Sequence, residues 1–377
     1  MRACAITGGH GFLAWHLRCR LKAEHPETEV RVLGRGALDD PVTLAEQVEG
    51  CDAVFHLAAV NSHEPAAAAT NVELAHALVD GLDRLARPTR VVYSNSAHAE
   101  GESPYGRSKR AASEALRRWA DRAGATVADV VLPNLFGENA RPNYNSAVAT
   151  FCDAVARGRT CEVNRSGRTE LLHAQDAAMA LLRHARSARS ATERISGESL
   201  RVGEVYDRIA GFHEAYRATQ TVPDLATRLD LRLFNQLRVA MYPAAYPVGL
   251  TSHADERGAF FEAARGSGET QTSFSTTHPG VTRGEHWHAD KIERFLVLRG
   301  QATIAIRRLF DEVVLEFKVS GDQPAFVDMP TLHAHSITNT GDDELLTMFW
   351  ANDHFRPEAP DTWPEAVRGH IPAGSRT

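Results

Sequence analysis

The chain has 377 residues, of which 43% are hydrophobic and 24% charged, an ordinary globular composition and a length that suits two domains. Its 42 basic and 48 acidic residues give a formal net charge of −6 at pH 7, which argues against sequence-independent binding to nucleic acid or to an anionic membrane. The five cysteines form no C-x-x-C pair and are expected to be free thiols in a reducing compartment. Because no apolar run approaches membrane-spanning length and a glycine-rich turn follows the first residues directly, we expect a soluble cytoplasmic protein without a signal peptide.

Short apolar runs alternate with helical stretches from Arg2 to about Met241. Strand-like runs are expected at 4–6, 30–33, 53–57, 90–93 and 127–132. Apolar residues recur at helical spacing over 12–22, 41–49, 68–85 and 108–123, and a helix-rich stretch covers 174–240. Regular alternation of strand and helix is typical of a parallel sheet covered on both faces, so we predict a Rossmann-type, doubly wound α/β domain over residues 1–247.

The pattern changes after the proline-bearing stretch 242–247. Short β-rich runs separated by Gly, Asp and Pro follow at 259–262, 271–277, 293–298, 301–307, 312–319, 325–329, 336–338 and 345–351. Many short strands at regular spacing are typical of a sandwich or a small barrel. We therefore predict a second, all-β domain over residues 248–377.

A glycine-rich segment, Thr7-Gly8-Gly9-His10-Gly11-Phe12-Leu13-Ala14, lies between the first predicted strand and the first predicted helix. Gly8 and Gly11 allow a tight turn and a close approach to a pyrophosphate, and the helix that follows presents its N-terminal amides to the negative charge. We predict a nicotinamide dinucleotide site here, with Thr7, Gly8, Gly11, Phe12 and Leu13 in contact with the cofactor.

The end of the second predicted strand indicates which nicotinamide cofactor fits. An Asp or Glu there would hydrogen-bond the ribose hydroxyls of NAD. The segment instead reads Val32-Leu33-Gly34-Arg35-Gly36, with no acid before Asp39. Arg35 can pair with a 2′-phosphate, so NADPH is favoured; the alternative is that Arg35 is a solvated surface residue.

A serine, a tyrosine and a lysine follow at a spacing that suits proton transfer. Tyr105 and Lys109 are four residues apart on a predicted helix and therefore share one face. A nearby ammonium lowers the pKa of a phenol, which makes Tyr105 a usable proton donor near neutral pH. The hydroxyl of Ser96, at the end of the preceding strand, can hold the reacting oxygen beside it.

These residues together resemble the extended short-chain dehydrogenase/reductase family, whose Ser–Tyr–Lys set acts on nucleotide-linked sugars. The resemblance implies that Ser96 binds the carbonyl, that Tyr105 donates the proton and that Lys109 is its electrostatic partner, the last two also contacting the cofactor. The segment Leu57-Ala58-Ala59, after His56, matches the strand that passes under the nicotinamide ring. Asn134 lies in Pro133-Asn134-Leu135-Phe136-Gly137, which matches the loop that enters the substrate site.

The β-rich part carries a second constellation. His286 and His288 are two apart on a predicted strand and point to the same face, and Glu293 on the next strand can converge with them. His335, from a distant hairpin, completes a set of three nitrogens and one carboxylate for a divalent ion. Zinc is the first choice for such ligands, whereas iron, nickel and manganese remain open because ligand identity does not fix the metal.

The spacing of these residues resembles both signature motifs of the cupin family, which implies a double-stranded β-helix, or jelly-roll, for residues 248–377. One departure is Leu332, where the family usually has Gly, and a reshaped turn before His335 is expected. Segments around Arg257 and Arg283 resemble the diphosphate-contacting parts of metal-free sugar-nucleotide epimerases that have a cupin barrel, so both are candidate substrate contacts.

An extended reductase domain followed by a metal cupin resembles, over essentially the whole chain, a family of bifunctional capsular polysaccharide enzymes. The segments 141–151, which includes Asn143 and Asn145 as candidate substrate contacts, and 284–288 carry the most specific likeness. The resemblance implies a UDP-2-acetamido-2,6-dideoxy-4-hexulose as substrate, C3 epimerisation in the cupin, NADPH-dependent reduction of the C4 ketone, and a UDP-N-acetyl-6-deoxytalosamine as product. A homodimer is also expected from this family.

The residue that moves the C3 proton is open. Lys291 alternates with Glu293, and His333 with His335, so each can share a face with a ligand and is a candidate base. Two other hypotheses stay in view: a reductase-only enzyme whose cupin is a structural or dimerising module, and a non-enzymatic nucleotide-sugar sensor. The intact set of Ser96, Tyr105 and Lys109 argues against the sensor.

Overall fold

The structure is a computed structural model that describes residues 1–62, 64–187, 189–251, 253–255, 258–260, 263–266, 270–353 and 361–369. The side chains of Arg35, Thr219, 253–255, 258–260 and 265–266 are not part of the description. Two compact units are present: Met1–Ala147 with Asn164–Val202, and Val148–Val163 with Gly203–Thr377. The division predicted after residue 247 stays a prediction; these units place 148–163 and 203–247 with the β-rich part.

The N-terminal unit is built on a six-stranded sheet in the order β2-β1-β3-β4-β5-β8, in which every neighbouring pair is parallel. Its strands are β1 (Ala3–Thr7), β2 (Glu29–Leu33), β3 (Ala53–His56), β4 (Arg90–Ser96), β5 (Val127–Leu132) and β8 (Ala191–Arg194). The strand order reverses beside β1, the position at which such sheets bind ligands at the carboxyl ends of their strands.

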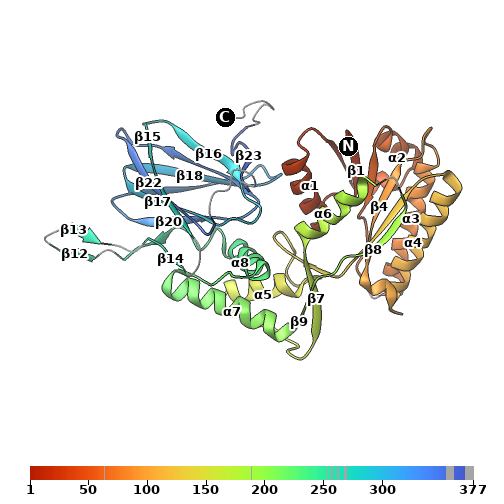
Figure 1. Ribbon diagram of the computed structural model, residues 1–377, viewed down its shortest axis with the longest axis horizontal. Helices are drawn as coiled ribbons and strands as arrows, with labels where there is room; N and C mark the ends of the chain where they lie inside the picture. Colours follow the sequence, from red (N-terminus) through yellow and green to blue (C-terminus); the bar gives the residue numbers. More distant parts are fainter. Residues whose placement is uncertain are drawn as a thin grey trace. The chain divides into compact units, whose positions relative to one another are not determined.

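Helices cover both faces of this sheet (Figure 1). The helices α1 (Phe12–Glu24) and α6 (Ala174–Ala185) pack on one face, and α2 (Pro41–Val48), α3 (Pro65–Leu82) and α4 (Pro104–Ala123) on the other. Strand residues alternate between the two cores: Cys4 and Ile6 face α1 and α6, whereas Ala3 and Ala5 face α2 to α4. The predicted doubly wound α/β domain is confirmed.

Short elements complete this unit. The 3-10 helices η1 (Arg35–Leu38) and η2 (Ala97–Glu100) follow β2 and β4. A small sheet, β6-β7-β9, is formed by β6 (Asn134–Phe136), β7 (Arg168–His173) and β9 (Glu198–Arg201). Strand β6 begins one residue after β5 ends. The segment after β6 therefore starts near the carboxyl end of the main sheet, which is where sheets of this type bind their ligands.

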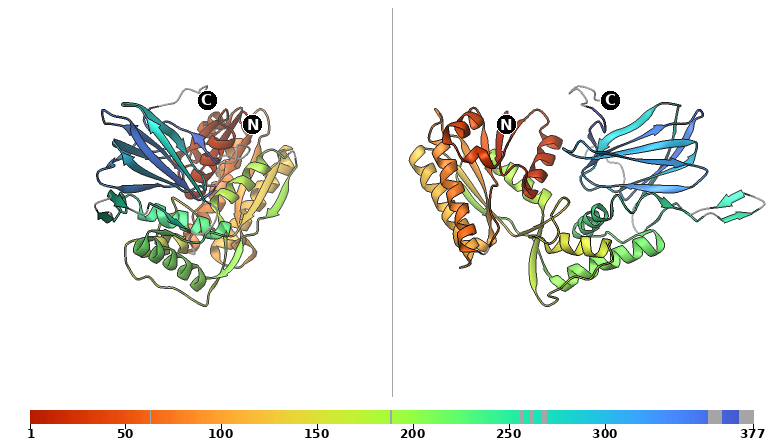
Figure 2. Two further views of the ribbon diagram at one scale, coloured as in Figure 1. Left: turned by 60° about the vertical axis from the view of Figure 1, so that its left-hand side comes forward. Right: turned by 180° about the vertical axis from the view of Figure 1, so that it is seen from behind.

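The second unit contains two five-stranded antiparallel sheets, β11-β20-β17-β22-β15 and β19-β18-β21-β16-β23 (Figure 2). The strands are β11 (Val248–Gly249), β15 (Gln271–Thr277), β16 (Thr282–Trp287), β17 (Glu293–Arg299), β18 (Gln301–Arg308), β19 (Val314–Ser320), β20 (Ala325–Met329), β21 (His333–Asn339), β22 (Leu345–Ala351) and β23 (Trp363–Pro364). Two short ladders, β10 (Thr221–Val222) with β14 (Arg265–Gly266) and β12 (His253–Asp255) with β13 (Gly258–Phe260), accompany them. The predicted all-β, cupin-type architecture is confirmed.

Three helices belong to the same unit: α5 (Ala147–Ala156), α7 (Val202–Thr219) and α8 (Arg228–Met241). Arg294 on β17 forms a buried two-point ion pair with Asp328 on β20, at 2.7 and 3.1 Å, and Tyr216 on α7 donates a hydrogen bond to the same carboxylate. Arg238 on α8 donates to the carbonyl of Met329 at 2.7 Å. A buried charge needs such partners, so these contacts fix α7 and α8 to the outer face of the sheet.

Candidate active sites

The turn between β1 and α1 lies against the end of β3. Gly8 has φ +64°, and a Cβ atom there would lie 2.7 Å from the Cα of Ala58, so only glycine fits. Thr7 links the two strands, because its Oγ1 lies 2.8 Å from His56 Nδ1 and accepts from the backbone N–H of Ala58 at 3.3 Å. The structure thus brings the predicted segments Thr7–Leu13 and Leu57–Ala59 together.

The N-terminus of α1 suits an anion. Gly11, its N-cap residue, offers no side chain to accept from the first-turn amides, which leaves those donors for a ligand. Phe12 and Leu13, the first two helical residues, border the cavity described next. Arg35 opens η1 after β2, as the sequence places it, but its side chain lies outside the described residues.

A cavity of about 510 Å³ opens at the carboxyl end of this sheet, a size that suits a small ligand. Its walls bring together most of the predicted reductase residues: Phe12, Leu13, Ala59, Ser96, Tyr105, Lys109, Asn134 and Asn145. Asn143 is exposed and does not line it. His98, Arg141 and Tyr144 also border the cavity; the sequence analysis did not single them out as site residues, although 141 and 144 lie in the segment with the specific likeness.

The backbone around Tyr105 fixes the position of its ring. Ser103 caps α4 by accepting from the N–H of Gly106 at 3.0 Å, and Pro104 occupies the first turn. A Cβ atom on Gly106 would lie 2.0 Å from the carbonyl oxygen of His98, so η2 and α4 approach each other only because residue 106 is glycine. The sequence analysis missed Gly106; its position directly after the tyrosine was the available signal.

Lys109 is almost completely buried, and its ammonium donates to the carbonyl of Ser94 at 2.7 Å and lies 4.2 Å from the ring centre of Tyr93. Burial lowers the pKa of Lys109 to about 7. Burial also raises the pKa of Tyr105, although its hydrogen bond with Ser96 lowers it. The expected lowering of the tyrosine pKa by Lys109 is therefore wrong for this structure, because desolvation of the phenol outweighs the other effects.

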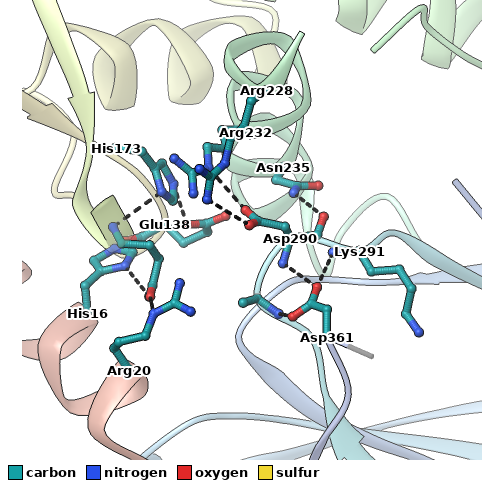
Figure 3. A network of polar contacts seen from close by, with 12 residues as sticks. His16, Arg20, Glu138, His173, Arg228, Arg232, Asn235, Asp290, Lys291 and Asp361 are labelled. Atoms are coloured by element: carbon teal, nitrogen blue, oxygen red, sulfur yellow. Dashed lines mark hydrogen bonds and ion pairs between the residues drawn. The ribbon is translucent and has the colours of Figure 1, made fainter. Parts of the chain in front are cut away.

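The loop beyond β6 is anchored by a buried polar cluster (Figure 3). Glu138 is 1% exposed and its carboxylate lies 3.3 Å from His173 Nε2; burial alone would raise its pKa, but His173 lowers the pKa of Glu138 to about 2. His16 Nε2 donates to the carbonyl of Glu138 at 2.7 Å, and burial lowers the pKa of His16 to about 3, so its ring stays neutral. Residues 139–146, which include cavity-lining side chains, follow this anchor directly.

In the second unit the four predicted metal ligands converge. Their ligand atoms all lie within 4.8 Å of one another. Glu293 Oε2 is the common neighbour, at 3.0 Å from His288 Nε2, 3.3 Å from His335 Nε2 and 3.6 Å from His286 Nε2. The strands β16, β17 and β21 therefore place three imidazole nitrogens and one carboxylate oxygen around a single point, a donor set typical of zinc and related divalent ions.

The protonation states of the cluster fit a metal. Burial lowers the pKa of His335 to about 3, which keeps the ring in the neutral, ligating form. Burial would raise the pKa of Glu293, but its three histidine neighbours hold it well below its usual range. Among the described residues, His286 Nε2 and His335 Nε2 are buried without a hydrogen bond of normal geometry, which a bound ion would remedy.

Leu332 keeps the backbone conformation that glycine would favour. Its φ is +61°, and its N–H donates to the carbonyl of His288 at 2.7 Å. The side chain is fully buried, and its apolar contacts offset the cost of the left-handed conformation. The expected reshaping of this turn is therefore limited, because Leu332 adopts the positive φ in place of Gly.

The remaining predicted residues lie at different distances from the cluster. Lys291 Nζ is 4.0 Å from Glu293 Oε1 and donates to Thr362 Oγ1 at 3.2 Å. His333 is buried, with Nδ1 2.8 Å from the carbonyl of Thr331 and its ring against Tyr242. Arg283 is bonded to β15, donating to Thr277 Oγ1 and to the carbonyl of Thr276, both at 3.0 Å. Arg257 lies outside the described residues.

No helix among the described residues combines the length and the apolar character needed to cross a membrane.

Comparison with known proteins identifies both parts of the chain. Residues 4–203 match the NAD dependent epimerase/dehydratase family, and residues 253–363 match the polysaccharide biosynthesis C-terminal domain. The UDP-2-acetamido-2,6-beta-L-arabino-hexul-4-ose reductase of Pseudomonas aeruginosa is 33% identical over 368 residues, covering 96% of this chain and 98% of the relative. The spore coat polysaccharide biosynthesis protein SpsL of Bacillus subtilis is 24% identical over 122 residues, 30% of this chain and 81% of that protein.

The crystal structure of the capsular polysaccharide assembling protein CapF from Staphylococcus aureus superposes on 97% of this chain and 99% of its own, with a TM-score of 0.59 and 28% identity. Similarity thus extends over nearly the full length of both chains, which confirms the predicted resemblance. The chain belongs to the NAD dependent epimerase/dehydratase family, and its residues 253–363 match the polysaccharide biosynthesis C-terminal domain.

Proposed function

We propose that this protein is a bifunctional nucleotide-sugar enzyme. Its cupin epimerises C3 of a UDP-2-acetamido-2,6-dideoxy-4-hexulose, and its reductase domain then reduces the C4 ketone with NADPH to a UDP-N-acetyl-6-deoxytalosamine. The observation that carries the proposal is that one chain holds a cavity with Ser96, Tyr105 and Lys109 and, separately, a four-ligand cluster. The name of the Pseudomonas aeruginosa relative, a reductase of a 2-acetamido hexul-4-ose, supports the substrate class.

In the reductase step the side chains act on the C4 oxygen. Ser96 holds the carbonyl, and Tyr105 donates the proton that the oxygen needs as it is reduced. Lys109 supplies a positive charge one helical turn from Tyr105. Asn134 and Asn145, at the cavity wall, are proposed to hold the sugar nucleotide, and Asn143 is proposed to contact it from the same loop. NADPH, when bound at the β1–α1 turn, supplies the hydride.

In the epimerisation step a proton leaves C3, next to the ketone, and returns on the opposite face. His286, His288, Glu293 and His335 would hold a divalent ion, which would supply Lewis-acid stabilisation for the charge that develops on the ketone oxygen. Lys291 is the favoured proton carrier because its amino group lies 4.0 Å from a ligand carboxylate, whereas the described contacts of the His333 ring are with Thr331 and Tyr242. Arg257 and Arg283 are proposed to contact the diphosphate.

The alternative is a reductase-only enzyme whose cupin is a structural or dimerising module. The name of the full-length Pseudomonas aeruginosa relative describes a reductase and favours this alternative. The two proposals differ in one respect, which is whether the histidine cluster is needed to turn over the unepimerised ketosugar.

The cofactor, the metal and the assembly are part of the proposal. NADPH is favoured because the chain has Arg35 and no acid directly after β2. Replacing Arg35 by alanine should therefore weaken NADPH binding about tenfold or more and leave NADH binding unchanged, because a charge-assisted contact is lost.

Zinc is the proposed ion, and elemental analysis of the purified protein tests it. We propose a cytoplasmic homodimer, to be tested by sedimentation equilibrium.

One incubation separates the two functions. The protein is mixed with UDP-2-acetamido-2,6-dideoxy-β-L-arabino-4-hexulose in deuterated buffer, first without NADPH and then with it. Deuterium at C3 before NADPH is added, absent in a His286→Ala/His288→Ala variant, supports the bifunctional enzyme. NADPH oxidation with no deuterium at C3 supports the reductase-only alternative. If neither deuterium incorporation at C3 nor NADPH oxidation is observed, the proposed substrate is contradicted.

A further inference from the structure

The turn that joins two of the proposed ligands, residues 289–292 between His288 and Glu293, is held by side chains from outside it (Figure 3). The carboxylate of Asp361 accepts from the backbone N–H groups of residues 289, 290 and 291, at 2.9, 2.9 and 2.8 Å. The side-chain oxygen of Asn352 accepts from the N–H of Ile292 at 2.7 Å. Four consecutive backbone donors are thus satisfied by side chains, so the shape of the turn depends on these acceptors.

Asp361 also contacts a ligand directly. Its backbone carbonyl lies 2.6 Å from His288 Nδ1. A carbonyl oxygen only accepts, so Nδ1 of His288 carries a proton in this contact, and Nε2 is the ring nitrogen that faces Glu293, 3.0 Å away, where a metal ion would bind. Fixing the tautomer and the ring orientation in this way is what the surroundings of metal-binding histidines do.

Helix α8 holds the same turn through Asp290. The Asp290 carboxylate lies 3.2 Å from Arg232 Nε, and its carbonyl accepts from Asn235 Nδ2 at 2.8 Å (Figure 3). The turn is therefore supported by Asp361, by Asn352 and by helix α8, and Asp361 is the support that also contacts His288.

We propose that Asp361 is a positioning residue for the metal centre. Through its carboxylate it sets the distance between His288, directly after β16, and Glu293, at the start of β17, and through its carbonyl it holds the Nδ1 proton of His288. The inference rests on the proposed metal site and goes beyond it, because Asp361 is not itself a ligand.

Residue type and backbone conformation at 361 allow a clean test. Its φ is +38°, in the left-handed region that glycine and Asn tolerate well. Asp361→Gly keeps the carbonyl and deletes the carboxylate. Asp361→Asn keeps the size, but its amide NH2 must take the place of one of the two carboxylate oxygens, so at least one backbone donor of the turn then faces another donor. Asp311→Asn is the matched control, since Asp311 is in the same unit and its carboxylate pairs with Arg308 at 2.8 and 3.1 Å.

The experiment titrates full-length, metal-stripped protein with Co²⁺, whose visible absorption reports coordination geometry, and with Zn²⁺ in competition with a chromophoric chelator. Both Asp361 variants should bind Zn²⁺ about 10- to 100-fold more weakly than wild type and show an altered Co²⁺ spectrum. Asp311→Asn should match wild type in both readouts.

Three results would overturn the inference in different ways. Wild-type affinity and spectrum in both Asp361 variants would show that the carboxylate positions nothing. Loss of secondary structure in both, measured by circular dichroism on metal-free protein, would make Asp361 a folding residue instead. Failure of wild type itself to bind Co²⁺ would remove the proposed metal site, a result distinct from the first two.

Discussion

The reductase cavity and the histidine cluster both bury ionisable side chains, but burial leaves them in different states. Lys109, 2% exposed, has a neutral carbonyl oxygen as its hydrogen-bond acceptor, and its pKa is lowered to about 7, so its charge still changes near neutral pH. His335, fully buried beside two further imidazoles, has a pKa lowered to about 3 and stays neutral at any working pH. Desolvation therefore gives the reductase cavity a lysine whose charge changes near neutral pH. In the histidine cluster it favours the neutral imidazole that can bind a metal ion.

The largest expected effect is that of Tyr105→Phe, which should impair the reductase step and leave the epimerisation step intact. Tyr105→Phe should lower kcat for NADPH oxidation about 10²- to 10⁴-fold, because the positioned proton donor is lost. Deuterium incorporation at C3 should stay at the wild-type rate, since the cluster draws on none of the cavity residues. Tyr206→Phe, on α7 with its ring against Phe151, is the matched control and should change neither rate. A loss of both activities in Tyr105→Phe would contradict the separation.

The reverse experiment removes the metal. Chelation should reduce C3 deuterium exchange by about 10²-fold or more, because stabilisation of the developing charge is lost. Reduction of a ketosugar supplied in the epimerised form should be unaffected, and added Zn²⁺ should restore exchange. If C3 deuterium exchange continues in metal-free protein, the epimerisation does not need a metal in the four-ligand cluster, and the reductase-only alternative is favoured.

Much of the fold and part of each site followed from local pattern. Alternation of strand and helix predicts the parallel sheet because each strand is buried on both faces, and His286 and His288 share a face because strand side chains alternate. Gly8 was predictable because its positive φ belongs to the local turn, whereas its close contact with Ala58 is a tertiary feature. The ligand His335 required the family motif, since nothing local brings β21 beside β16.

Other features depend on tertiary contacts that no local pattern contains. The pKa of Tyr105 depends on how deeply α4 is buried, so the sequence suggested the wrong direction. Helices α7 and α8 have the spacing of any amphipathic helix, and contacts such as Tyr216 with Asp328 and Arg238 with the carbonyl of Met329 place them on the β sheet. Asp361 is 70 to 72 residues away in sequence from the backbone donors that it binds.

A smaller effect is expected at the turn beside β3. Gly8→Ala should weaken NADPH binding by about 1–3 kcal/mol, which combines backbone strain at φ +64° with a Cβ atom 2.7 Å from Ala58. Gly124→Ala separates these contributions, because Gly124 has φ +65° at the end of α4 with nothing within 4 Å of the added Cβ. That variant should lower the melting temperature slightly and leave NADPH affinity unchanged. Equal affinity in wild type and Gly8→Ala would mean that the cofactor does not approach this turn.

The smallest effect is a pH dependence of cofactor binding at the reductase site. The Lys109 ammonium is present below its pKa of about 7 and is lost as pH rises through that value, so at pH 8 about a tenth of the molecules retain it. If the cofactor binds the charged form, the Kd for NADPH should rise about tenfold between pH 6 and pH 8. The 2′-phosphate of NADPH titrates in the same range, so the difference between wild type and Lys109→Met is the quantity to measure. A Lys109→Met variant with the same slope as wild type would show that the buried lysine does not set this dependence.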